Sequence, residues 1–146
     1  MIQANELRLG NWVQAVGDKW VLDNAYWVHG DYIQVTAYDL SHIHGCNKRD
    51  EKPSHAPIPL TPKILEQCGF MVDSVSVVTY KQWDMVTTTT RYIIMDGLLE
   101  ITSTHNDHDE QTVWNSKFVA NIKSLHQLQN LYYATLSDEL TFTPKK

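Results

Sequence analysis

The sequence predicts an α+β fold, and three observations carry that prediction. Short segments rich in β-branched and aromatic residues fill most of the chain, which is typical of antiparallel strands. One segment near the middle has helix-capping residues at both of its ends. A segment near the C-terminus repeats apolar residues every three or four positions, as an amphipathic helix does. We therefore expect an N-terminal small SH3-like β unit, a short capped helix, and an antiparallel β meander with a C-terminal amphipathic helix packed on it.

The first third of the chain predicts the small β unit. Residues 6–16, 19–28 and 32–43 are β-rich segments separated by turn signals at Gly17 and Gly30. The third segment alternates most regularly and predicts the most regular of these strands. Several short strands at this spacing indicate a small barrel or a curled meander.

A polar, charged segment follows at residues 44–57 and is expected to form a loop or linker. A chain of 146 residues suffices for a single domain whose core needs no disulfide or metal. It also allows two lobes, a small β unit at residues 1–56 and an α+β lobe at residues 57–146.

The clearest local signal is a short helix after Thr61. Thr61 is expected to be the N-cap, Pro62 the first helical residue and Gly69 the residue just past the end. Leu60 and Leu65 have the spacing of a hydrophobic staple. These residues define both ends of a helix of about two turns.

The chain then predicts a four-stranded antiparallel meander. Its strands are expected at residues 75–82, 85–95, 98–104 and 111–119, because these segments are rich in β-branched residues. Asp96-Gly97 is a hairpin turn signal between the second and third strands.

The C-terminal helix is predicted from one apolar stripe. The stripe consists of Leu125, Leu128, Leu131, Tyr132 and Leu136. His126 and Gln129 lie off this stripe, so we expect His126 at an exposed or edge position. Residues 140–143 (LTFT) are expected to add a last strand.

Composition limits the class of protein. The formal charge is −5 and neither half of the chain has a basic block, so we do not expect nucleic-acid binding. No apolar stretch is long enough to span a membrane and no signal peptide is evident, which predicts a cytoplasmic protein. Cys46 and Cys68 form no disulfide framework, and Cys68 is expected to be a buried thiol.

Three segments resemble a family of small uncharacterised bacterial and prophage-type proteins. They are ELRLGNWV at residues 6–13, PIPLT with a following GF at residues 57–70, and HQLQNLYYATLSDEL at residues 126–140. They occur in the family's order, although Ser137 stands where the family pattern has a helix-ending glycine. The resemblance brings no established activity, cofactor or catalytic residue. It implies an accessory role in a mobile element or prophage.

Two groups of residues could bind metal. His42 and His44 would lie on one face of the predicted strand, followed by Cys46, with His55 close enough in the loop to join them. Such a set suits zinc and would make the chain a metal-dependent enzyme. The second group, HNDHDE at residues 105–110, could bind a cation through carboxylates and imidazoles, but a solvated hairpin loop explains it as well.

Five aromatic residues crowd the first β unit, and a small barrel cannot bury them all. They are Trp12, Trp20, Tyr26, Trp27 and Tyr38. Exposed aromatics on a barrel suit a peptide or a stacked base, and the acidic chain favours a protein partner. The alternative is that they pack against the second lobe.

The leading interpretation is therefore a non-enzymatic binding or accessory module. Helix caps, apolar helix stripes and the alternation of strand residues account for nearly every notable residue. No group of residues is left over that would form a catalytic site. A metal-dependent enzyme using His42, His44, Cys46 and His55 is the alternative, and a nucleic-acid-binding module is a third.

Overall fold

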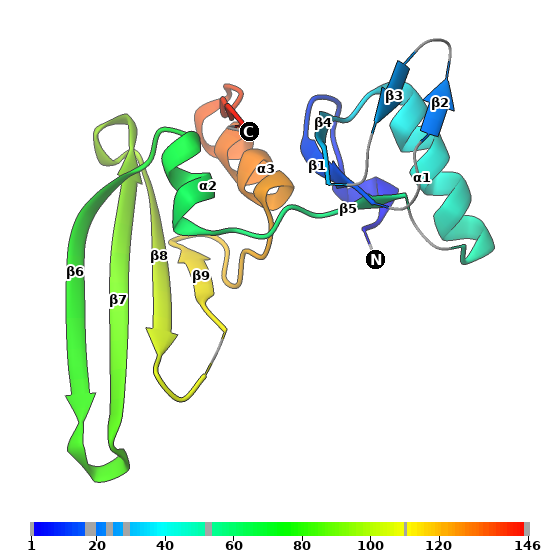
Figure 1. Cartoon of the computed structure of the whole chain (residues 1–146). Helices are drawn as coiled ribbons and strands as arrows, with labels where there is room; N and C mark the ends of the chain where they lie inside the picture. Colours follow the sequence, from blue (N-terminus) through cyan, green and yellow to red (C-terminus); the bar gives the residue numbers. More distant parts are fainter. Residues whose placement is uncertain are drawn as a thin grey trace. The chain divides into compact units, whose positions relative to one another are not determined.

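The structure is a computed structural model of the chain, shown in Figure 1. It describes residues 2–16, 20–22, 25–27, 30–51, 54–109 and 111–144, with the backbone alone described at 20–22 and 25–27. The chain divides into two compact units, and the predicted α+β class is confirmed. Unit 1 consists of Met1–Pro59 and Ser124–Asn130, and unit 2 of Leu60–Lys123 and Leu131–Lys146.

Unit 1 combines a helix with two small antiparallel sheets. One sheet has the strand order β4–β1–β5, and the other is the hairpin β2–β3. Because the described strands form two separate sheets, the SH3-like character of this unit is not confirmed. The elements are η1 (Ala4–Glu6), β1 (Trp12–Ala15), β2 (Trp20–Leu22), β3 (Ala25–Trp27), β4 (Tyr32–Gln34), α1 (Ala37–Arg49) and β5 (His55–Ala56).

Helix α1 corrects the sequence prediction for this region. Alternation over residues 32–43 predicts a strand, but α1 occupies most of that stretch. The cause is a capping box. The Thr36 side chain accepts a hydrogen bond from the Asp39 N–H, and the Asp39 carboxylate accepts one from the Thr36 N–H. The helix also covers residues 44–49, where the polar composition wrongly predicts a loop.

The core of unit 1 draws on η1, β1, α1 and the residue after β4. Its buried members are Ile2, Leu7, Val13, Val35 and Ile43. Helix α3 (Leu125–Leu136) contributes its first half to this unit. There the Gln129 side-chain oxygen accepts a hydrogen bond from the Trp12 N–H at 2.8 Å, which connects α3 to β1.

Unit 2 begins with α2 (Pro62–Gln67), whose predicted ends are confirmed. The Thr61 side chain accepts a hydrogen bond from the Ile64 N–H at 3.2 Å. Gly69 has a φ of +89°, and the N–H of the next residue, Phe70, donates to the Leu65 carbonyl at 3.0 Å. The caps therefore specify this short helix.

The predicted four-stranded meander is also confirmed. Its antiparallel order is β6–β7–β8–β9. The hairpin between β6 and β7 turns through η2 (Lys81–Trp83), and the next one turns through η3 (Met95–Gly97). The strands are β6 (Met71–Tyr80), β7 (Met85–Ile94), β8 (Leu99–Asn106) and β9 (Val113–Ser116). In Figure 1, α2 and the last turns of α3 lie near one end of this sheet, and the β6–β7 hairpin extends away from them.

Helix α3 has the expected apolar stripe, but the predicted position of His126 is wrong. His126 is 1% exposed and Gln129 is 2% exposed. Both side chains lie off the apolar stripe. They are buried because the first half of α3 packs within unit 1. The predicted last strand at residues 140–143 is also wrong. Leu140 and Phe142 are instead buried in an irregular segment.

No helix in the described ranges has both the length and the apolar character needed to cross a membrane.

Candidate interaction surface

Strand β6 forms one edge of the sheet of unit 2, and all ten of its residues are exposed. It pairs with β7 on one side, and no strand of the described residues pairs with its other side. In an antiparallel edge strand, every second residue directs its backbone N–H and C=O away from the sheet. The outer side of β6 is therefore a template on which another strand can add.

Apolar side chains stand on both faces of β6. Val75 and Val77 lie on the same face as the buried Tyr92, yet they are 59% and 61% exposed. Val78 and Tyr80 lie on the opposite face and are also exposed. The helices of unit 2 therefore leave this part of the strand uncovered on both faces.

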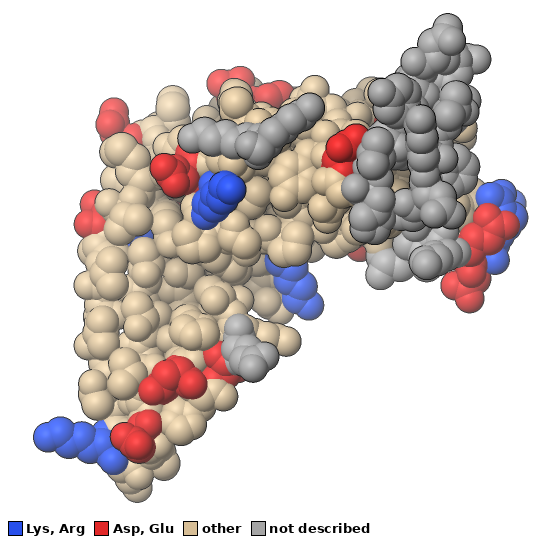
Figure 2. All heavy atoms as spheres, in the orientation of Figure 1, with Lys and Arg blue, Asp and Glu red and all other residues tan. Residues whose placement is uncertain are grey.

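Residues 74–80 of this edge lack the features that usually protect such strands. Residues 74–80 contain no charge, no proline and no glycine, a composition that favours pairing with other strands. The one charged residue of β6 is Asp73, at a register irregularity between Val72 and Ser74. Figure 2 shows mostly uncharged residues over the face of unit 2 in that view.

The other edge of the same sheet is closed by the chain itself. Beside β9, the Ile122 N–H donates to the Trp114 carbonyl at 2.7 Å, and the Ser116 N–H donates to the Val119 carbonyl at 2.8 Å. The segment that follows β9 thus uses backbone groups of that short strand. The contrast makes the open edge of β6 the distinctive feature of the sheet.

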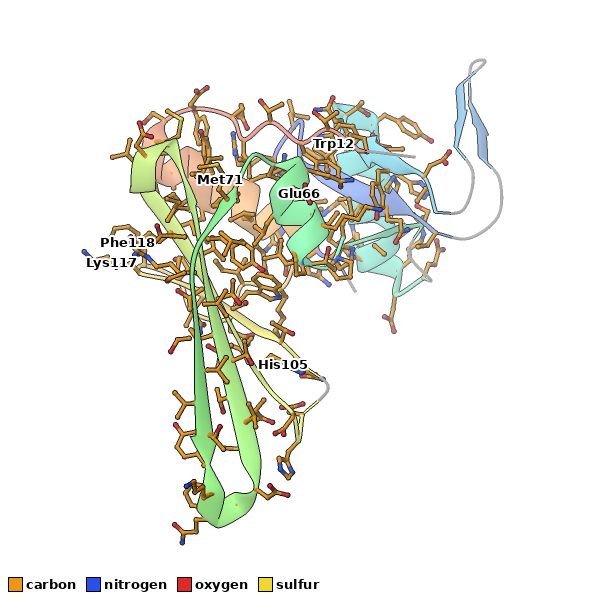
Figure 3. The ribbon with its side chains drawn as sticks, turned by 60° about the vertical axis from the view of Figure 1, so that its left-hand side comes forward. Trp12, Glu66, Met71, His105, Lys117 and Phe118 are labelled. Atoms are coloured by element: carbon orange, nitrogen blue, oxygen red, sulfur yellow. The ribbon has the colours of Figure 1, made fainter. Side chains whose placement is uncertain are left out.

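An open cleft of about 450 Å³ adjoins the first residues of β6. Lys63 and Glu66 of α2 line it together with Phe70, Met71 and Tyr92. Figure 3 labels Glu66 on the helix and Met71 at the start of the strand. Of β6, only Met71 and Val72 line the cleft, so a strand paired with residues 74–80 meets it only by continuing past Asp73.

The residues of the predicted zinc site come together only in part. His42, His44 and Cys46 lie on α1, where residues two apart point to different sides. His42 Nε2 lies 3.7 Å from Cys46 Sγ, and the His42 ring centroid lies 6.1 Å from that of His55. His44 is exposed and stays apart. Within the described ranges, no group of three or more His, Cys, Asp or Glu side chains is placed to hold a metal ion.

His55 instead belongs to a buried polar network that the sequence analysis missed. Ser54 Oγ lies 2.8 Å from His55 Nδ1, and His55 Nε2 lies 3.2 Å from Asp39 Oδ1. A serine hydrolase triad has the same three residue types, but there the serine contacts Nε2 and the aspartate Nδ1, the reverse of this network. Ser54 is also only 5% exposed, and His55 is fully buried. No substrate can reach that hydroxyl in this conformation. The network ties β5 to the N-terminus of α1.

Three pKa values respond to burial. Burial alone raises the pKa of Asp39, but hydrogen bonds from His55 and Thr36 outweigh that effect and lower it. Burial lowers the pKa of His126, although the Glu6 carboxylate, 3.7 Å from Nε2, opposes the change. Burial raises the pKa of Cys68 to about 12, so its thiol is protonated at neutral pH, as expected of a buried cysteine.

Of the five residues of the predicted aromatic surface, the structure describes the side chains of two, Trp12 and Tyr38. Trp12 is half-buried, and Tyr38 is half-exposed with its ring stacked on His42 at a centroid distance of 6.3 Å. The side chains of Trp20, Tyr26 and Trp27 lie outside the described part of the structure. The backbones of the two tryptophans face each other in the β2–β3 hairpin.

Residues 105–109 of the second predicted metal group lie at the end of β8 and in the turn after it. The Asp107 carboxylate accepts a hydrogen bond from the Val86 N–H at 2.8 Å, and His108 Nε2 lies 2.8 Å from the Asp84 carbonyl oxygen. Glu110 lies outside the described residues. The contacts of Asp107 and His108 thus connect this turn to the β6–β7 hairpin.

Comparisons with protein-family models, with curated protein sequences and with solved structures find no match for this chain.

Proposed function

We propose that the chain is a non-enzymatic binding module that accepts a β-strand of a protein along the outer side of β6. The observation that carries this proposal is the open edge at residues 74–80, which combines available backbone groups with exposed apolar side chains. Main-chain hydrogen bonds supply affinity in this mode of recognition, and alternate side chains supply selectivity.

The chemistry of the edge favours a protein over a nucleic acid. Phosphate groups are bound by clustered Lys and Arg, and residues 74–80 contain neither. Exposed valines offer nothing to a phosphate, whereas they pack well against the β-branched residues of another strand. The cleft beside α2 adds a recess for a side chain of a bound strand that continues past Asp73.

The resemblance of the chain to small prophage-type proteins supports an accessory role of this module in a mobile element. Such a module would act in the cytoplasm by holding a protein partner. The composition of the open edge agrees with a site that is covered in the working state, since long apolar edges left open promote aggregation.

Site-specific photo-crosslinking in the native cell tests this proposal. A photoreactive amino acid replaces Val77 on the open edge, and the matched control carries it at Leu98, which is 65% exposed in the same unit. We expect a defined crosslinked polypeptide from position 77, identified by mass spectrometry, and little from position 98. Equal or absent crosslinking at the two positions would contradict the proposal.

A further inference from the structure

We propose that the strand added to β6 is β6 of a second copy of this chain, in an antiparallel register centred on Val77. The inference rests on the proposed strand-addition function and names the partner. Self-pairing of this kind is isologous, so every contact occurs twice around a two-fold axis. The end charges and the side-chain sizes fit the same register.

The charges at the two ends of the edge match in this register. Asp73, in the register irregularity of β6, and Lys81, the first residue of η2, flank residues 74–80 at opposite ends. Lys81 of the second copy therefore comes near Asp73, just beyond the paired residues. Asp73 shares the Arg91 guanidinium with Glu100, which leaves that end with a net negative charge. Lys81 forms no ion pair with any described residue. The uncharged stretch between these ends brings no like charges together.

The sizes of the facing side chains also fit. On the face that carries Tyr92, Val77 faces Val77 of the second copy and Val75 faces Thr79, which gives a ladder of β-branched pairs. On the opposite face, Val78 faces Ser76 and Tyr80 faces Ser74. Each larger side chain therefore meets a small one.

Neighbouring registers lose this agreement. Centring the pair on Val78 sets Lys81 against Val75, and centring it on Ser76 sets Lys81 against Met71. Neither places Lys81 opposite Asp73. All three registers keep residues of one face together, so that the two sheets continue into one, and the end charges are what distinguish the register centred on Val77.

The length of the edge sets the expected strength. Residues 74–80 span about 23 Å, which makes a small interface. We therefore expect a reversible dimer with a dissociation constant in the micromolar range.

A cysteine on the two-fold axis tests the register. Directly opposed residues of an antiparallel pair lie within disulfide distance, and the native Cys46 and Cys68 are buried and do not compete. Under mild oxidation, we expect Val77→Cys to form a covalent dimer at least about tenfold faster than the control Leu98→Cys. Equal rates would overturn the proposed register.

The end charges supply a second test. By sedimentation at low salt, we expect Lys81→Glu to weaken the dimer about fivefold, because it brings a carboxylate near Asp73, and Lys81→Arg to preserve it. An unchanged dissociation constant in Lys81→Glu would contradict the match between Asp73 and Lys81.

The experiments distinguish an error in the self-pairing proposal from an error in the proposed strand-addition function. If the wild-type chain stays monomeric at every concentration while position 77 crosslinks another polypeptide, the self-pairing proposal is wrong and the binding module stands. If the chain stays monomeric and position 77 crosslinks nothing, both proposals are wrong.

Discussion

Replacing Asp39 by alanine is expected to destabilise unit 1 strongly. The Asp39 carboxylate accepts hydrogen bonds from Thr36 Oγ at 2.6 Å and from the Thr36 N–H at 2.8 Å, and it lies 3.2 Å from His55 Nε2. Asp39→Ala removes half of the capping box of α1, which costs about 0.5–2 kcal/mol. It also leaves a fully buried imidazole without its acceptor, which costs about 1–3 kcal/mol.

The expected loss in the free energy of unfolding is therefore about 1.5–5 kcal/mol. Urea denaturation followed by tryptophan fluorescence measures it, with Glu51→Gln as the control, because Glu51 is an exposed carboxylate at the other end of α1. The pKa of Asp39 is lower in the folded chain than its usual 3.8, so its stabilising effect is present above pH 3.8 and is lost as the pH falls through the folded-state value. A loss below about 1 kcal/mol in Asp39→Ala would refute the reasoning.

Three further predictions concern buried residues. Burial lowers the pKa of His126 below its usual 6.5. As the pH falls, this side chain therefore takes up its proton at a higher pH in the unfolded chain than in the folded chain. The melting temperature should therefore fall as the pH drops below 6.5, and a His126→Gln variant that melts with the same pH dependence would show that another group is responsible. Leu128→Asp should prevent folding, because Leu128 is fully buried, whereas Tyr133→Asp on the exposed side of α3 should fold normally by circular dichroism. Cys68 should resist alkylation in the folded chain at mildly alkaline pH, and rapid labelling there would contradict its pKa of about 12.

The sequence predicted best those elements whose ends carry their own signals. Thr61, Pro62 and Gly69 determine α2 through contacts within a few residues, so tertiary structure was not needed to place it. The meander was predicted for a similar reason. Long β-branched segments separated by turn residues leave few alternatives to hairpins.

Helix α1 was missed because two local signals competed. Alternation from Tyr32 onward resembles a strand, but the Thr36 and Asp39 side chains cap a helix, and the cap prevails. A search for Ser or Thr followed three residues later by an acidic residue would have found it. The burial of His55 could not be found in this way, because it depends on the pairing of β5 with β1.

The candidate interaction surface could not be predicted for a related reason. The segment at residues 74–80 is a typical strand in sequence, and an inner strand would have the same composition. Its exposure follows from its place at the end of the strand order, which is a property of the whole sheet. Local signals in a sequence carry no information on which strand lies at an edge.

Residue-resolved hydrogen exchange across β6 tests the open edge most directly. In dilute solution, we predict that amides in residues 74–80 alternate between slow exchange, where they bond to β7, and fast exchange, where they point outward. The fast set should slow as the protein concentration rises and a second copy adds its strand. Uniformly slow exchange at high dilution would mean that the chain itself covers the edge, and that result would contradict the account.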